Sequence, residues 1–238
     1  MKLFSYWHGE LSPLAAECIA SWRANTSLET VVLTDATLGA YVPVSELPST
    51  LAAVHPALRS DLVRLLVLFV HGGVWLDATV KLNRPVDFER LLADDYACLY
   101  LDPSMTRGVH PENWLIVARQ RDESVGMLFA LLRAVAEHFP KYSDHPIYRS
   151  AFIREHRDPD ERYYMMYDCY LYLLHHEPRF VAARKITGVT FSMNAEDSSD
   201  VNKHTRVSPF RGRGVGATGL VSSAVALACL AAFIGVSQ

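Results

Sequence analysis

Two carboxylates and one guanidinium stand in the most apolar part of this 238-residue chain, where a charge is costly unless it is paired or used. Asp61 and Arg64 lie three residues apart in the run SDLVRLLVLFVH, and Asp77 follows the run VWL. Such groups can hold hydroxyls, phosphates or a hard divalent cation. The residue types leave an alternative open, a structural ion pair between Asp61 and Arg64 inside the core.

A buried helix, a glycine turn and a buried strand must position these groups. Residues 57–71 predict a helix that is apolar nearly all round, with Asp61 and Arg64 on one face. A glycine pair ends it, and residues 74–76 predict a strand that ends at Asp77. Because ligands of open α/β sheets bind outside the carboxyl ends of the strands, we expect the three charged groups to meet in one crevice.

Strands and helices alternate along the chain, which predicts an α/β fold with parallel strands at its start. Further strands are predicted at residues 2–7, 28–35, 94–102 and 113–118, with 79–82 continuing the central strand or starting another, and with late strands at 179–184 and 188–193. Further helices are predicted at 13–25, where Pro13 takes the first turn, and at 124–139 and 163–176.

Composition excludes several classes of protein. Half of the residues are hydrophobic and the net charge is −3 with no basic stripe, so the composition indicates a globular domain without a nucleic-acid partner.

Four cysteines without a CxxC pair favour buried free thiols. The motifs typical of serine hydrolases, zinc proteases and P-loop kinases are missing, and no signal peptide is visible, which favours a cytoplasmic protein.

One stretch resembles a known group of families. S-D-x-x-R, then G-G-V-W-L-D-A-T-V and Pro85, resembles the sugar transferases that carry a DxD motif. These include the yeast Golgi initiating α-mannosyltransferases, the glucosylating clostridial toxins and, most similar through W-x-D-A-T, the bacterial capsular polysaccharide synthesis proteins. The openings F-S-Y-W-H-G and V-V-L-T-D support the resemblance, which covers roughly residues 1–180.

The resemblance implies a fold and an activity. The implied fold is a single α/β nucleotide-diphospho-sugar transferase domain of the GT-A type, with a mixed central sheet and flanking helices. The implied activity is that of a retaining glycosyltransferase (hexosyltransferase) in capsule or other glycan biosynthesis. Its partners would be a nucleotide-sugar donor and a glycan or lipid-linked glycan acceptor.

The resemblance also implies roles for single residues. Trp7 matches a tryptophan that stacks on the base, and Asp61 and Arg64 match a pair that contacts the donor's sugar moieties. Asp77 matches the first DxD carboxylate, which touches ribose, donor sugar and metal. Thr79 replaces the second carboxylate, and its neutral hydroxyl is a weaker ligand for Mn²⁺ or Mg²⁺. An alternative is therefore a catalytically weak sugar-nucleotide-binding subunit of a polysaccharide assembly complex; a purely structural role is a third.

Other polar and aromatic residues near strand ends are candidates too. On the donor side, Tyr6 has core packing as its alternative, as does Trp7, and His8 could reach a phosphate. Asp35 suits a contact to base or ribose, with helix capping as the alternative. Candidates for the acceptor or diphosphate side, with loop and core roles as alternatives, are Arg107, His110, Asn113, Trp114 and Asp168.

The composition changes after residue 194. The predicted catalytic domain covers residues 1–194, a polar linker 195–214, and an uncharged apolar helix 215–236. The last segment is long enough to span a bilayer, and arginines precede it, so an anchored domain would stay cytoplasmic. A helix packed on the domain is the alternative.

Overall fold

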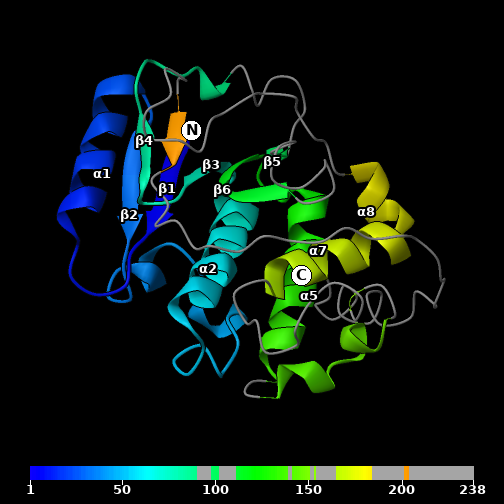
Figure 1. Cartoon of the computed structure of the whole chain (residues 1–238). Helices are drawn as coiled ribbons and strands as arrows, with labels where there is room; N and C mark the ends of the chain where they lie inside the picture. Colours follow the sequence, from blue (N-terminus) through cyan, green and yellow to red (C-terminus); the bar gives the residue numbers. More distant parts are fainter. Residues whose placement is uncertain are drawn as a thin grey trace, which may run out of the picture. The chain divides into compact units, whose positions relative to one another are not determined.

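The computed structural model describes residues 1–89, 98–101, 111–138, 141–150, 153, 165–183 and 201–203, with the backbone alone at 98–101, 111–112 and 201–203. Figure 1 labels the helices and strands, and the chain divides into two compact units. The first contains Met1–Val42 and Val67–Asp122, and the second contains Pro43–Leu66 and Glu123–Arg184. Each unit is described by itself.

A five-stranded sheet forms the centre of the first unit. Its strands are β1 (Lys2–Tyr6), β2 (Glu29–Leu33), β3 (Gly73–Leu76), β5 (Cys98–Leu101) and β6 (Pro111–Ala118), in the order β2-β1-β3-β6-β5. β1 pairs in parallel with both β2 and β3, whereas β6 pairs antiparallel with β3 and β5. The predicted mixed α/β sheet is therefore confirmed.

The glycine pair joins helix α2 (Pro56–His71) to β3 in a conformation that few other residues adopt. Gly72 has φ +63° and Gly73 φ +107°, both in the left-handed region. A Cβ on Gly73 would lie 2.4 Å from the carbonyl oxygen of Lys2, and one on Gly72 would lie 2.4 Å from the amide nitrogen of Gln120. The pair therefore ends the helix, as predicted, and also lets β3 approach its neighbours closely.

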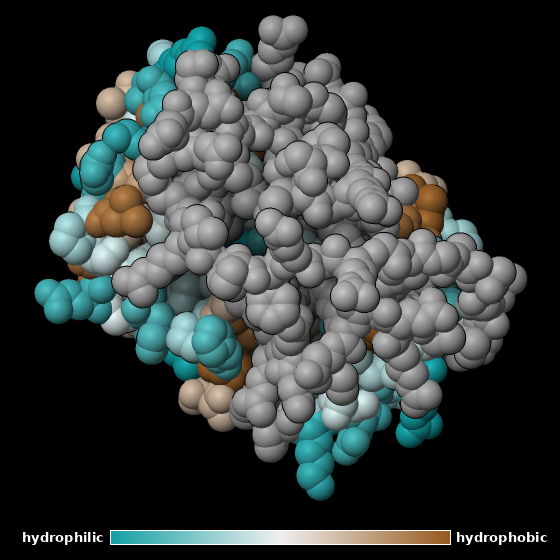
Figure 2. Space-filling view, viewed as in Figure 1, coloured by the Kyte–Doolittle hydropathy of each residue, from teal (hydrophilic) through white to brown (hydrophobic). Residues whose placement is uncertain are grey.

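Helix α1 (Pro13–Asn25) begins where the sequence predicts. The hydroxyl of Ser12 accepts a hydrogen bond from the amide of Ala15 at 3.2 Å, and Pro13 takes the first turn. Trp22 of this helix is fully buried among core side chains from β1, β3 and β6. In Figure 2, the region of α1 and β2 presents hydrophilic residues with a few hydrophobic ones between them.

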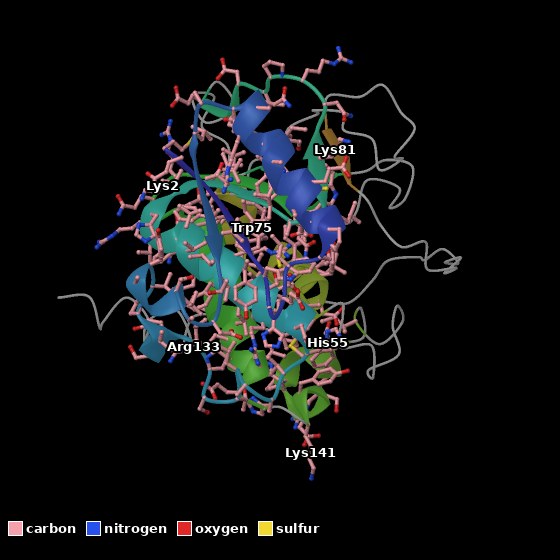
Figure 3. All side chains as sticks on the ribbon, turned by 90° about the vertical axis from the view of Figure 1, so that its left-hand side faces the viewer. Lys2, His55, Trp75, Lys81, Arg133 and Lys141 are labelled. Atoms are coloured by element: carbon pink, nitrogen blue, oxygen red, sulfur yellow. The ribbon has the colours of Figure 1, made fainter. Side chains whose placement is uncertain are left out.

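The strand after Asp77 does not continue β3. β4 (Val80–Leu82) pairs antiparallel with β7 (Val201–Lys203) in a separate two-stranded sheet. Side chains of α1 bind the backbone of β4: the indole of Trp22 donates to the carbonyl of Val80 at 2.6 Å, and the amide of Asn25 donates to that of Leu82 at 3.0 Å. Figure 3 shows Lys81 of this strand beside α1. β7 lies within residues 195–214, so the segment predicted as a linker contains a strand.

Helices make up most of the second unit. They are residues 56–66 of α2, the helices α5 (Glu123–Ala136), α7 (Met165–His176) and α8 (Pro178–Ala183), and the 3₁₀ turns η2 (Val44–Glu46), η3 (Tyr142–Asp144) and η4 (Pro146–Arg149). The 3₁₀ turn η1 (Leu38–Ala40) belongs to the first unit. α5, α7 and α8 pack on one another. Arg133 of α5 pairs with Glu46 of η2 at 3.0 Å.

The prediction of a strand at residues 179–184 is wrong, because α8 occupies that segment. Pro178 begins this helix, and the carboxylate of Glu177 accepts the amide of Arg179 at 3.1 Å as a cap. A short apolar run with two alanines fits a helix as well as a strand, and here Phe180 is buried against the ring of Tyr170.

Two of the four cysteines have described side chains. Cys18 and Cys169 are free and buried, as expected, and burial raises the pKa of the Cys18 thiol to about 11. Among the described residues, no helix has both the length and the apolar character that a membrane crossing requires. The strand predicted at 188–193 and the apolar segment 215–236 lie outside the described residues.

Replacement of Gly73 by alanine should destabilise the protein by about 2–5 kcal/mol, because it adds backbone strain to a clash with β1. Gly9 is a matched control, since it also has a positive φ, +82°, but no atom lies within 4 Å of the position of its Cβ. Gly9→Ala should cost only about 1–2 kcal/mol. Urea unfolding of both variants measures the difference, and equal costs would contradict the close approach.

Buried His145 predicts a loss of stability in acid. It caps η4 by accepting the amide of Ile147, and its ring meets that of His138 edge to face at 5.0 Å. Burial, and secondarily His138, lowers the pKa of His145 from 6.5 to about 4. The unfolded chain therefore takes up a proton below pH 6.5 that the folded state refuses down to about pH 4, so stability falls as the pH drops through this window.

The free energy of unfolding should fall by on the order of 3 kcal/mol between pH 7 and pH 4. His145→Asn keeps a capping oxygen but has no proton to gain, so this part of the pH dependence should disappear. Denaturant titrations at several pH values measure it. Identical pH profiles for the variant and the wild type would show that His145 does not cause the effect.

Candidate functional site

Three parallel strands bring the predicted donor-side residues of the first unit to one edge of the sheet. Tyr6 ends β1 in register with Leu33, the last residue of β2, and Leu76 ends β3 on the other side of β1. Asp35 and Asp77 follow these last two strand ends. The carboxyl edge of the sheet therefore carries aromatic, imidazole and carboxylate groups from three strands, the position in which open α/β sheets bind ligands.

Asp77 is held in place by both its side chain and its backbone. The indole of Trp75 donates to Asp77 Oδ1 at 2.9 Å, and the amide of Asp77 donates to the carbonyl of Trp114 at 2.9 Å. The carbonyl of Asp77 in turn accepts the amide of Val80. Trp75, labelled in Figure 3, is fully buried. The half-buried carboxylate is thus fixed before any ligand arrives.

A second carboxylate joins the ends of β1 and β2. The phenol of Tyr6 donates to Asp35 Oδ1 at 2.5 Å, and the Nδ1 of His8 lies 2.7 Å from Asp35 Oδ2. Tyr6 is buried, whereas His8 and Asp35 are exposed. Asp35 therefore links a buried phenol to an exposed imidazole.

Trp7 packs partly into the core at the edge of the sheet. Its side chain is half-buried and packs against the core cluster, and its indole donates to the carbonyl of Glu10 at 2.8 Å. The amide of Trp7 extends the β1–β2 pairing by donating to Leu33 at 2.9 Å. The ring is thus fixed at the sheet edge; its stacking on a base stays a prediction.

Asp61 and Arg64 form a buried ion pair in the second unit. Their side chains lie 3.2 Å apart and are 6% and 4% exposed, and a guanidinium nitrogen of Arg64 also donates to the hydroxyl of Ser60 at 3.4 Å. The structural pair that the sequence left open is therefore present. Because Asp77 belongs to the other unit, the meeting of the three charged groups in one crevice stays a prediction.

The candidates for the acceptor side lie in different surroundings. Trp114 is fully buried in the core cluster and supports Asp77 through its backbone, while Asn113 beside it is half-buried. Asp168 is buried in the second unit and accepts the phenol of Tyr148 at 3.3 Å. Burial, and then the neighbouring Cys169 and Asp168, raises the pKa of Tyr148, so it stays a donor. Arg107 and His110 lie outside the described residues.

Thr79 is half-buried two residues beyond Asp77. Within the part of the chain that the structure describes, no group of three His, Cys, Asp or Glu side chains could hold a metal ion. The oxygen atoms of Asp77 and Thr79 are nevertheless of the kind that Mg²⁺ and Mn²⁺ accept.

Sequence reasoning missed the support that Trp75 gives to Asp77. The signal was available, because residues i and i+2 of a strand lie on the same face, so an indole two residues before a carboxylate can reach it. The link from Asp35 to Tyr6 and His8 had no comparable signal, since it depends on the register of β1 against β2.

Breaking the buried pair should destabilise the fold strongly. Arg64→Met and Asp61→Asn should each cost about 3–5 kcal/mol, because each leaves its partner buried without the ion pair. The double variant should cost clearly less than the sum of the two, which a double-mutant cycle by urea unfolding measures. Costs that simply add would contradict a direct pair.

The family model described as "Capsular polysaccharide synthesis protein" matches residues 3–152, more than half of the chain. A search of curated proteins found no match. Among solved structures, "PaToxG Glycosyltransferase" shares 12% identity, with 76% of this chain and 72% of that chain covered and a TM-score of 0.45. From the match over residues 3–152, which includes Trp7, Asp61, Arg64 and Asp77, the chain belongs to the capsular polysaccharide synthesis protein family.

Proposed function

We propose that this chain is a glycosyltransferase that moves a sugar from a nucleotide-diphospho-sugar to a glycan or lipid-linked glycan during polysaccharide synthesis. The observation that carries the proposal is the fixed carboxylate of Asp77 at the carboxyl edge of the sheet, held by the indole of Trp75. Membership of a capsular polysaccharide synthesis family supports it. A GT-A type of domain, retention of configuration and transfer of a hexose come from the sequence resemblance and belong to the same proposal.

The proposed chemistry needs positioning and charge neutralisation more than covalent help. As the bond to the sugar breaks, negative charge collects on the leaving diphosphate. Asp77 would orient the donor through ribose or sugar hydroxyls, and its preorganisation by Trp75 avoids reorganising the site during the reaction. Asp61 and Arg64 are proposed to contact the donor, as the resemblance implies, in addition to pairing with each other.

A divalent cation is part of the proposal. Asp77 and Thr79 would hold Mn²⁺ or Mg²⁺ together with water and the donor's phosphates, a set of hard oxygen ligands. The ion would supply positive charge beside the leaving group. With one carboxylate and one neutral hydroxyl, binding should be weaker than at a site with two carboxylates.

Thr79 also favours a second candidate function. Loss of one metal-binding carboxylate would suit a catalytically weak subunit that binds sugar nucleotides within a polysaccharide assembly complex. Such a subunit would bind the donor but turn it over very slowly. Association with a membrane through residues 215–236 is compatible with both candidates and stays a prediction.

Donor hydrolysis by purified protein with Mn²⁺ tests the proposal. A panel of UDP- and GDP-sugars is first screened by thermal shift, since a ligand that binds only the native state raises the midpoint. With the donor so found, Asp77→Asn should lower hydrolysis by about a hundredfold or more. Thr79→Asp should lower the Mn²⁺ concentration that is needed for half-maximal activity.

Glu29→Gln is the matched control, because Glu29 is an exposed carboxylate at the opposite, amino end of β2, paired with Lys2. Its activity should equal that of the wild type. Hydrolysis that survives Asp77→Asn would contradict the proposed site. Donor binding without turnover, with turnover gained in Thr79→Asp, would favour the binding-subunit candidate.

A further inference from the structure

We propose that His8 binds the diphosphate of the donor through its Nε2 atom, and that Asp35 is the positioning residue that aims it. This inference rests on the proposed function, because it presumes that a nucleoside diphosphate binds at the carboxyl edge of the sheet. It changes the role expected for Asp35, which the sequence suggested as a direct contact to base or ribose.

Both oxygens of Asp35 have partners within the protein. Oδ1 accepts the phenol of Tyr6 at 2.5 Å, and Oδ2 lies 2.7 Å from the Nδ1 of His8. A carboxylate only accepts hydrogen bonds, so Nδ1 of His8 must carry the proton in this contact. Nε2 is consequently the ring nitrogen through which His8 would reach a ligand.

Neighbouring contacts fix this geometry. Tyr6 is buried, so its phenol is a rigid support for Asp35. Asp35 itself lies in a turn closed by Thr34 and Thr37, in which the amide of Thr34 donates to the hydroxyl of Thr37 at 2.9 Å and the amide of Leu38 donates to the carbonyl of Thr34 at 2.9 Å. The imidazole is therefore held from a rigid part of the sheet edge, as a preorganised ligand contact requires.

Charge favours an anionic ligand at Nε2. When the ring carries a proton on both nitrogens, Nε2 also donates, and its hydrogen bond to an anionic phosphate oxygen is stronger than one to a neutral oxygen. A ribose hydroxyl would gain less from this arrangement. A carboxylate that accepts from one ring nitrogen commonly orients a histidine so that its other nitrogen faces the ligand.

His8 and Asp35 are too exposed for their contact to act mainly as a stabilising contact of the core. The side chains of His8 and Asp35 are 46% and 48% exposed, so a ligand can reach them. Exposed ion pairs contribute little to folding. Variants at either position should therefore fold, and their effects should appear in ligand binding.

Calorimetric titration with UDP, GDP and ADP, alongside uridine, guanosine and adenosine, tests the inference. His8→Gln should weaken binding of the preferred diphosphate about tenfold to a hundredfold while changing nucleoside affinity less than about twofold. Asp35→Asn should act in the same direction but less strongly. In the His8→Gln background Asp35→Asn should cause no further loss, because Asp35 acts through His8.

His55→Asn is the control, since His55 is an exposed histidine whose Nδ1 accepts the amide of Ala57, and asparagine keeps a capping group. Figure 3 labels its position. This variant should bind like the wild type. Unchanged diphosphate affinity in His8→Gln, parallel losses for nucleosides, or additive effects of the two substitutions would each overturn the inference. If the wild type binds none of the three diphosphates, the proposed function fails with it.

Discussion

The close approach of β3 to β1 is the constraint on which the first unit depends. At Gly73 the backbones come so near that a Cβ would lie 2.4 Å from the carbonyl oxygen of Lys2. β3 pairs with β1 on one side and with β6 on the other, so it connects the parallel and antiparallel parts of the sheet. Any side chain at this glycine would disturb both, and with them the strand that carries Trp75 to Asp77.

This packing fixes polar groups that would otherwise be mobile. Asp77 is bound by an indole from its own strand, and Asp35 is bound by a buried phenol from the neighbouring strand. In each case an aromatic donor supports a carboxylate at the carboxyl edge of the sheet. The edge is thus rigid before a ligand arrives, and a donor that binds there would find its contacts already oriented.

Local signals in the sequence were sufficient for much of this structure. The glycine pair, the apolar run before it and Ser12-Pro13 predicted the ends of α2 and α1 correctly, because caps and breakers act within one turn. The spacing of Asp61 and Arg64 predicted that they share one helix face, and the ion pair that the sequence left open as an alternative is present. Two features that the sequence did not predict depend on residues far apart in the chain: β4 pairs with residues 201–203, and the contact of His8 with Asp35 spans 27 residues. The strand prediction at 179–184 was wrong because so short an apolar run fits either a strand or a helix.

Hydrogen exchange of the full chain, followed by mass spectrometry with and without a saturating nucleotide-sugar donor, tests the central claim most directly. We predict that the donor slows exchange in the three segments that follow the parallel strands, residues 7–10, 34–38 and 77–80, and leaves residues 141–150 unchanged. A donor that binds without slowing exchange in any of the three would show that the carboxyl edge of this sheet is not its site.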